Sequence, residues 1–404
     1  MALNTKRTSF KERSVVKVSV VIPCYNSERY ISQTIDSVVS QTISPLEVIL
    51  VDDQSQDGTL DLLRRKEKQY KGLVKITELQ KNQGASYARN YGAKQALGDY
   101  ILFMDADDLA EPKLIEKYCS RLEEINTEEK GQYKLCYSAY IQIDENDCVI
   151  SEISRGIQFE PGETLGYEFV RNYILSTSGV LVKKDVFTTL EGFNENIRYS
   201  EDWDLWLRLA GITDFAYVDE PLIKLRRHGN NLSSKVAKML QGERDVLRQY
   251  GLEYIRKAIY RRKLSIEHNT IDYVSILFRL DHWNEGSLEL KKLIDHGYDF
   301  YNLYFYLGLY YLKNREIEKA LDYFLKTINL NKDHSAALNN AGALLLVQGN
   351  RQAAREYFSS ALRYFPNYLD AGYNFELLAR EFITIEDLKF TWRELRKVLL
   401  IYSK

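Results

Sequence analysis

Three aspartates, Asp105, Asp107 and Asp108, directly follow an apolar run over residues 100–104. A short run of bulky, uncharged residues is typical of a strand buried on both faces. Open α/β sheets bind ligands at the carboxyl ends of their strands. Carboxylates this close repel one another unless a cation lies between them, and hard oxygen ligands favour magnesium, manganese or calcium over zinc. Taken alone, the cluster is equally consistent with an acidic turn that caps a helix near Pro112.

The elements around this cluster predict an α/β fold. Apolar runs at 18–22, 47–51, 74–79 and 100–104 alternate with helical patterns, which favours a doubly wound, mostly parallel sheet with right-handed crossovers and helices on both faces. Polar residues follow every strand at the same expected edge, namely Tyr25 and Asn26, Asp52 and Asp53, Gly84 and Arg89, and the aspartate cluster. The arrangement predicts a nucleotide pocket with an acceptor for a base N–H, a cation for phosphate and an arginine for charge.

Two common nucleotide fingerprints are missing from the sequence. Neither the G-x-G-x-x-G dinucleotide motif nor the G-x-x-x-x-G-K-[ST] phosphate loop occurs. A dehydrogenase or a P-loop kinase is therefore disfavoured.

Four ordered segments carry a resemblance to a known family. They are VSVVIPCYNSERYISQTIDSVVSQT, EVILVDDQSQDGT, NQGASYARNYGAKQALGDYILFMDADD and EGFNENIRYSEDWDLWLRLA. Over about residues 17–235 the chain resembles the family 2 glycosyltransferases of the GT-A fold. The resemblance implies a nucleotide-sugar donor, expected to be a UDP-sugar, and a Mn²⁺ or Mg²⁺ cofactor. It implies donor contacts from Pro23, Tyr25, Asn26, Asp53, Gly84, Arg89, Asp105, Ala106, Asp107 and Arg226.

Within this resemblance, Asp53 is expected to accept a hydrogen bond from a uracil N–H, while Asp52 orients the turn. Asp105 and Asp107 match the D-x-D pair. Asp107 is expected to bind the metal, and Asp105 the metal or the ribose. A helix-capping aspartate is the alternative reading of Asp53.

The segment beginning at Glu201 predicts a helix with Asp202 in its first turn. The resemblance makes Asp202 the general base, and inverting sugar transfer needs a carboxylate that takes the acceptor proton. Glu201 is the rival base and Asp204 a weaker one; plain stabilisation of the helix N-terminus is the alternative. Trp203 and Trp206 could face the sugar, but core packing is the more common outcome.

Further along, the segment LIKLRRHGNNLS resembles the R-x-H segment of the family, here Arg226 and His228. The resemblance implies that the arginine contacts phosphate and that the histidine reaches the metal or the diphosphate, although a structural histidine fits nearly as well. The Q-x-x-R-W signature of processive synthases is absent. Transfer of a single sugar is therefore expected.

Bulk properties set limits on the remaining questions. A chain of 404 residues is too long for one compact core, and a net charge of -2 gives no reason to expect nucleic-acid binding. No apolar run reaches the roughly 18 residues of a membrane span. The polar, basic residues 1–16 predict a disordered lead-in rather than a signal peptide. Four cysteines without metal spacing favour a cytoplasmic protein, with peripheral attachment at the inner membrane face left open.

Beyond residue 235 the chain reads as helical. Residues 236–260 predict one amphipathic helix, Arg261, Arg262 and Lys263 a solvated charge run, and 236–264 a helical linker. The pattern around Gly308 recurs around Gly342, an offset of 342 − 308 = 34 residues, which is the tetratricopeptide period. Residues 265–404 therefore predict a solenoid, with degenerate or capping units at 268–298 and 368–402. Its concave face could bind protein or peptide, pair in a homodimer, or only support the other domain.

The sequence thus predicts an inverting, metal-dependent glycosyltransferase. Its acceptor is expected to be a surface glycan, a lipid-linked sugar, a teichoic-type polymer, or a peptide or protein. The alternative is a catalytically silent sugar-nucleotide fold that acts as a scaffold for its repeats.

Overall fold

A computed structural model describes residues 16–128, 133–228 and 236–395. These residues form two compact units. The first unit contains residues 16–164 and 172–228, and the second contains 165–171 and 236–395. The expected lead-in at 1–16 lies almost wholly outside the described residues.

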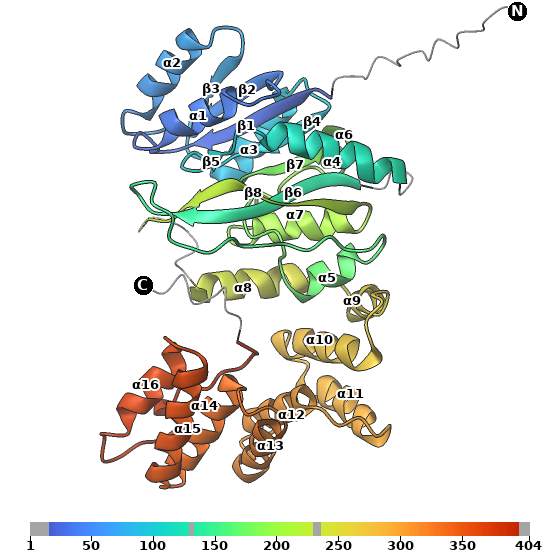
Figure 1. Cartoon of the computed structure of the whole chain (residues 1–404), viewed down its shortest axis with the longest axis vertical. Helices are drawn as coiled ribbons and strands as arrows, with labels where there is room; N and C mark the ends of the chain where they lie inside the picture. Colours follow the sequence, from blue (N-terminus) through green and yellow to red (C-terminus); the bar gives the residue numbers. More distant parts are fainter. Residues whose placement is uncertain (1–15, 129–132, 229–235, 396–404) are drawn as a thin grey trace, which may run out of the picture. The chain divides into compact units, whose positions relative to one another are not determined.

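The first unit is built on one eight-stranded sheet (Figure 1). The strand order is β3-β2-β1-β4-β7-β6-β8-β5. The strands are β1 (Val18–Cys24), β2 (Glu47–Asp52), β3 (Val74–Glu78), β4 (Tyr100–Phe103), β5 (Leu109–Ala110), β6 (Tyr133–Ile143), β7 (Val180–Lys183) and β8 (Asp214–Arg226).

The sheet is mixed. The strands β3, β2, β1 and β4 are parallel to one another, as the βαβ pattern predicts, and β6 is parallel to β8. The strand β7 is antiparallel to β4 and to β6, and β5 is antiparallel to β8. The predicted α/β class is confirmed, while this second half was not foreseen in detail.

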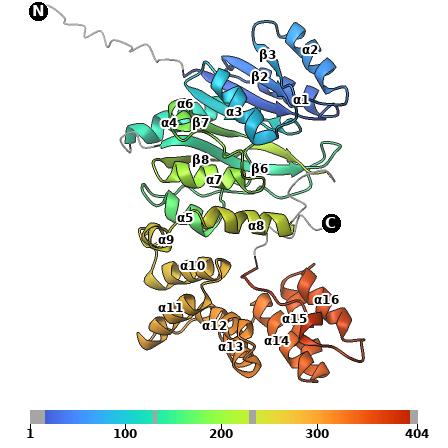
Figure 2. The ribbon, with the colours of Figure 1, turned by 180° about the vertical axis from the view of Figure 1, so that it is seen from behind.

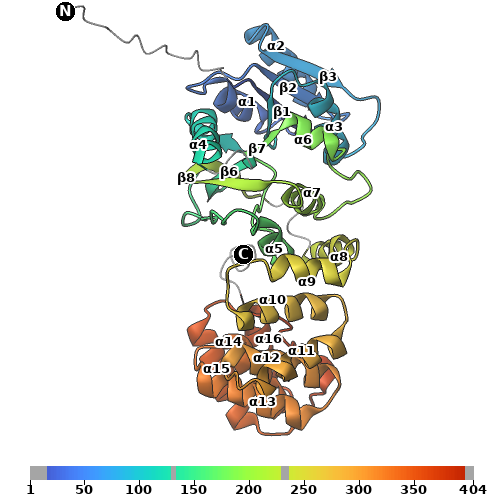
Figure 3. The same ribbon diagram turned by 90° about the vertical axis from the view of Figure 1, so that its right-hand side faces the viewer.

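Helices cover both faces of the sheet, as Figure 2 shows from behind and Figure 3 nearly edge-on. One apolar core lies under α1 (Ile31–Val39), α2 (Thr59–Gln69) and α4 (Leu114–Glu128). The opposite core lies under α3 (Ala85–Gln95), α6 (Lys184–Thr189) and α7 (Glu201–Ala210). The parallel strands therefore end between two helical layers, which leaves their carboxyl edge available to loops.

The polar residues between β1 and α1 do not cap the helix. Tyr30 holds the N-cap position and no side chain caps the helix. Asn26 has a left-handed φ of 47°, and the Ser27 N–H donates to Thr59 Oγ1. The polar residues after β1 therefore connect to the neighbouring loop instead of capping the helix.

The second unit is helical. It contains α5 (Thr164–Val170) almost entirely, followed by the helices α8 (Val236–Leu247), α9 (Leu252–Ile259), α10 (Ile266–Arg279), α11 (Trp283–Asp295), α12 (Tyr301–Lys313), α13 (Ile317–Leu330), α14 (Ser335–Val347), α15 (Arg351–Tyr364) and α16 (Leu369–Leu377). The first residues of α12, α14 and α16 lie 34 apart (335 − 301 and 369 − 335), as do those of α13 and α15 (351 − 317). The helices thus follow the 34-residue period of the sequence.

Three details of this unit differ from the sequence predictions. The single helix expected over 236–260 is two helices, which end and begin around Gly251. Both belong to the second unit rather than to a separate linker. Arg262, expected in a solvated charge run, is buried, donates to Asn269 Oδ1 and pairs with Asp272 at 2.8 Å. In the described part of the chain, no helix has the length and apolarity that a membrane span requires.

Candidate active site

The loops after β1 and β2 are joined by hydrogen bonds. Asn26 N donates to Ser55 Oγ at 3.0 Å, and Gln56 N donates to Asn26 Oδ1 at 2.7 Å. Pro23 lies in β1, and Tyr25 just beyond it is 50% exposed. The carboxyl edge of the sheet thus carries an exposed aromatic ring, on a loop that hydrogen bonds to the loop after β2 hold in place.

Asp53 connects the loop after β2 to the loop before α3. Its carboxylate accepts two backbone hydrogen bonds, from Gln83 N and Gly84 N, both at 2.8 Å. Gly84 has a φ of 89° at the N-cap of α3, a conformation that favours glycine. Asp53 therefore joins the end of β2 to the start of α3, and both carboxylate oxygens already have partners.

Arg89 connects two parts of the sequence-predicted site. Its Nη2 lies 2.6 Å from Asp105 Oδ1, and its Nη1 lies 3.8 Å from Glu201 Oε1. The guanidinium is buried and lies 5.4 Å from the ring centroid of Phe193. Burial by itself lowers the pKa of Arg89, but the charges of Asp105 and Glu201 outweigh it and raise the pKa. The D-x-D turn and the first turn of α7 are therefore both close to the guanidinium of Arg89.

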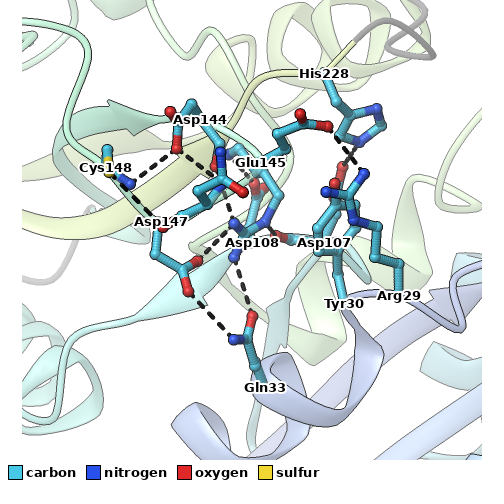
Figure 4. A network of polar contacts seen from close by, with 12 residues as sticks. Arg29, Tyr30, Gln33, Asp107, Asp108, Asp144, Glu145, Asp147, Cys148 and His228 are labelled. Atoms are coloured by element: carbon cyan, nitrogen blue, oxygen red, sulfur yellow. Dashed lines mark hydrogen bonds and ion pairs between the residues drawn. The ribbon is translucent and has the colours of Figure 1, made fainter.

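Asp107 lies on the other side of the turn, against His228. The His228 Nε2 is 2.9 Å from Asp107 Oδ2, and the imidazole stacks on Tyr30 with centroids 5.4 Å apart (Figure 4). The side chains of Asp107 and His228 are 24% and 19% exposed, so both can reach a ligand. Of the three expected metal ligands, these two are adjacent, whereas Asp105 is held by Arg89.

Arg226 has a different environment from the expected phosphate contact. Its guanidinium is buried beneath the D-x-D turn, where Nε donates to the Asp107 carbonyl and Nη1 pairs with Asp147 at 2.6 Å. It also stacks on Tyr30, with Cζ 4.5 Å from the ring centroid. Arg226 therefore anchors the turn, and reaching a phosphate would require these contacts to break.

The loop at 144–148 completes this anchor, as Figure 4 shows. Gln33 Nε2 donates to Asp147 Oδ2, and Arg29 pairs with Glu145 at 2.9 Å. The Asp144 carbonyl accepts from Arg226. The loop thus ties α1 to the strands behind the aspartates.

Asp108 is buried at the inner side of the D-x-D turn, against β8. Its Oδ1 accepts from Arg226 N at 2.8 Å. Burial, and then repulsion by Asp107 and Asp105, raises the pKa of Asp108 well above its usual range. The buried carboxyl of Asp108 therefore favours its neutral form. The neighbouring residue Ala106 accepts from Thr34 through its carbonyl.

Asp202 lies in the first turn of α7. Its Oδ1 accepts from Trp203 N at 2.7 Å, and its Oδ2 accepts from Asn172 Nδ2 at 3.3 Å. Burial, and then the charge of Glu201, raises the pKa of Asp202 to about 7. The carboxylate is thus poised to exchange a proton near neutral pH.

The two rival carboxylates have other surroundings. Glu201 faces Arg89, and burial raises the pKa of Glu201 although that arginine opposes the shift. Asp204 is buried and pairs with Arg208 at 2.6 Å along the same helix. Asp204 therefore serves the packing of α7. Trp203 and Trp206 are fully buried, so neither faces a sugar.

The chemistry of the donor set fits a divalent cation in part. Asp107 and His228 supply one oxygen and one nitrogen, a pair compatible with manganese. Among the described residues, no group of three or more histidine, cysteine or acidic side chains is placed so that it could hold a metal ion by itself. A cation there would need further oxygen ligands from a bound diphosphate or from water.

Several residues of the site were not predicted from the sequence. They are Ser178, whose hydroxyl accepts from Asp105 N, Asn172 beside Asp202, Phe193 beneath Arg89, and the acidic loop. The acidic run 144–147 after a long strand was the one available signal. The others are single polar or aromatic residues with no distinctive spacing.

Comparison with known proteins finds a family match within the first unit. Residues 19–128 match the family model described as glycosyl transferase family 2. An uncharacterized glycosyltransferase of Haemophilus influenzae is 28% identical over 72% of this chain and 87% of its own length. Chondroitin synthase of Escherichia coli is 30% identical over 55% of this chain, and that match spans 31% of its own length.

Among solved structures, S. aureus TarS residues 1–349 in complex with UDP-GlcNAc aligns with a TM-score of 0.49 at 20% identity. The alignment covers 86% of this chain and 91% of that one. Residues 19–128 therefore match glycosyl transferase family 2, and together with the related enzymes this identifies the chain, with its mixed and helix-covered sheet, as a glycosyltransferase.

Proposed function

We propose that the chain transfers a single sugar from a nucleotide sugar to an acceptor hydroxyl, with inversion at the anomeric carbon. The expected donor is a UDP-sugar, in keeping with the UDP-GlcNAc complex of TarS. The acceptor is a glycan, a lipid-linked sugar, or a peptide or protein.

The observation that carries this proposal is the position of Arg89. One guanidinium lies 2.6 Å from Asp105 and 3.8 Å from Glu201, the neighbour of Asp202. Asp105 is expected to contact the donor, and Asp202 is expected to activate the acceptor. The guanidinium of Arg89 therefore lies between the two parts of the proposed site. Such convergence of residues distant in sequence is what a transfer reaction between two bound molecules requires.

Asp202 acts as the general base in this proposal. It takes the proton of the acceptor hydroxyl while the acceptor oxygen bonds to the anomeric carbon and the bond to the diphosphate breaks. Asn172 and the Trp203 N–H hold the carboxylate in place. One displacement of this kind inverts the configuration and forms no bond between enzyme and sugar.

Asp107 and His228 are the residues that would hold a divalent cation. Such a cation would stabilise negative charge on the leaving diphosphate. Arg226 keeps the turn that carries Asp107 in place. Tyr25 offers an exposed ring against which the donor base can stack.

The test is a panel of sugar nucleotides with manganese or with a chelator, with mass detection of the released nucleotide. We expect one donor to be hydrolysed slowly even without acceptor, and the chelator to suppress the reaction. Asp107→Ala should weaken donor binding only when manganese is present. Equal donor affinity with and without the metal in the unmodified chain would contradict the metal part of the proposal.

A further inference from the structure

The second unit holds an extended stretch of its own chain against its helices. We call residues 388–395, which follow a short 3-10 turn at Ile385–Asp387, the strap. Leu388 and Phe390 pack on the apolar cores of the repeats, and Trp392 lies 5.8 Å from Trp283. The strap contacts the first helices of successive repeats, α14 and α16.

Two asparagines grip the backbone of the strap. Asn340 donates through Nδ2 to the Thr391 carbonyl and accepts from Thr391 N at Oδ1, at 2.9 and 2.8 Å. Asn374 does the same with Lys389, at 2.8 and 2.9 Å. A side-chain amide has the donor and acceptor of a peptide unit, so each asparagine pairs with the strap as a neighbouring strand would.

The repeat itself produces this arrangement. Asn340 and Asn374 are 34 residues apart (374 − 340), so they occupy equivalent positions on α14 and α16. They bind alternate residues of the strap, which is the spacing of one face of an extended chain. One repeat earlier, the equivalent position is Tyr306. Among the described repeats, an asparagine that pairs with the strap backbone at this position therefore occurs twice.

With the strap in place, these asparagines are fully shielded from water. Asn339, Asn340 and Asn374 are each 0% exposed, and Asn339 donates to the Lys389 carbonyl at 2.9 Å. Buried amides need partners, and packing alone would be served better by apolar residues. The groove is therefore built to receive a polypeptide backbone.

One side chain adds specificity. The Thr391 hydroxyl donates to Asp370 Oδ2 at 2.8 Å and contacts the hydroxyl of Tyr368 and the amide of Asn339. The side chain of Lys389 projects outward and is exposed. A matching ligand needs a small hydroxyl residue at the position of Thr391 and apolar residues beside it.

We infer that the groove over α14 and α16 is a binding site for an extended polypeptide with a threonine or serine at its centre, and that the strap occupies this site as an internal ligand. A second polypeptide reaches the groove when the strap leaves. This site is separate from the proposed sugar-transfer site, so either proposal can fail without the other.

The test uses the full chain and a fluorescent peptide of residues 384–395. Thr391→Pro in the chain removes the N–H that Asn340 accepts and the hydroxyl that Asp370 accepts, so it should release the strap. We expect this variant to bind the peptide at least roughly tenfold more tightly than the unmodified chain, because the internal competitor has lost several hydrogen bonds. Arg393→Pro is the matched control and should leave peptide binding unchanged.

N-methylated peptides show which backbone N–H groups of the ligand the groove recognises. N-methylation of the peptide at residue 391 should abolish binding, whereas N-methylation at residue 390 should be tolerated. Asn374→Ala added to Thr391→Pro should also abolish binding. The inference is overturned if Thr391→Pro melts normally but binds no more peptide, or if it unfolds the second unit, since the strap would then be a fixed part of the fold. A dimeric unmodified chain with a monomeric Thr391→Pro variant would instead place the strap in a second copy.

Discussion

At the scale of single residues, the environment of Asp202 supports the role of base that we propose for it. Its carboxylate is buried next to Glu201, and these two effects raise its pKa to about 7. The N–H of Trp203, the charge of Arg89 and the amide of Asn172 limit the rise. A base is most effective when its pKa lies near the working pH, because it is then both ionised and basic.

Asp202→Asn should reduce sugar transfer by about a hundredfold to ten-thousandfold, the usual contribution of a general base. The amide keeps the size of the side chain but cannot take a proton. Steady-state transfer rates and donor affinity by calorimetry measure the two effects separately. Donor affinity should stay within a factor of two. If transfer were unchanged and Glu201→Gln abolished it, Glu201 would be the base.

The raised pKa of Asp202 also predicts a pH dependence of stability. In the unfolded chain this carboxylate loses its proton near pH 4, whereas in the folded protein it does so near 7. The unfolded state therefore binds fewer protons between these values, and stability falls as pH rises through this window. Below it the contribution is fully present; above about 7 it is lost.

Asp202→Asn removes this contribution. The variant should gain about 1 to 3 kcal/mol over the unmodified chain at pH 8 and little at pH 4. Urea unfolding of both proteins at the two pH values measures the difference. A constant difference at both pH values would mean that the folded protein does not perturb this carboxylate.

At the scale of elements, the D-x-D turn depends on a buried arginine carried by β8. Arg226→Met should cost about 2 to 4 kcal/mol, because the Asp107 and Asp144 carbonyls and Asp147 lose their partner. Donor affinity in manganese should fall with it. Thermal melts and donor titrations measure both effects, and the adjacent Arg227→Met is the control. An Arg226→Met variant with native stability and weak donor binding would favour a direct phosphate contact.

The helical repeats depend on two glycines at equivalent positions. A Cβ at Gly308 would lie 2.6 Å from the Phe324 ring, and one at Gly342 2.8 Å from Phe358. Either alanine substitution should destabilise the second unit by about 1 to 3 kcal/mol through overpacking. Gly372→Ala, on a helix with open space around it, should be neutral or stabilising by up to about 1 kcal/mol. Equal melting temperatures for all three variants would show that the helix pairs are loosely packed.

The sequence predicted strands and periods well and contacts poorly. Strands β1 to β4 begin at the residues where the four apolar runs begin, and the 34-residue offset reappears in the helix starts, because both follow from local sequence patterns. Arg262 was misplaced and the burial of Arg226 was not predicted, since a charged residue shows its exposure only through tertiary partners. The bond between Arg89 and Asp105 joins residues on different elements, and no local pattern encodes it.

At the scale of the whole molecule, the two units are interlaced in sequence. Residues 165–171 belong to the second unit but lie between β6 and β7 of the first. Phe169 is fully buried against Tyr250 and Tyr254, and Arg279 donates to the Val170 carbonyl. A domain boundary near residue 235, as the sequence suggests, would therefore separate α5 from the helices of the second unit that it packs against.

Two truncations test this dependence. A fragment that ends at residue 231 exposes Phe169 and should aggregate or melt without cooperativity. A fragment that ends at residue 264 keeps Tyr250, Tyr254 and Arg262, which lies over Tyr167, and should melt cooperatively. Size-exclusion chromatography and calorimetry distinguish them. Equal behaviour of the two fragments would mean that α5 needs no helical partner.

The return of the chain through α5 has a consequence for how such enzymes can diversify. A single crossover between genes, placed after the sheet, would deliver new helices without the short segment that fits them. Gly166 illustrates the mismatch, because a Cβ there would lie 2.3 Å from the Ala258 carbonyl oxygen. Exchange of the helical unit would therefore require a matched change in the gene segment that encodes α5.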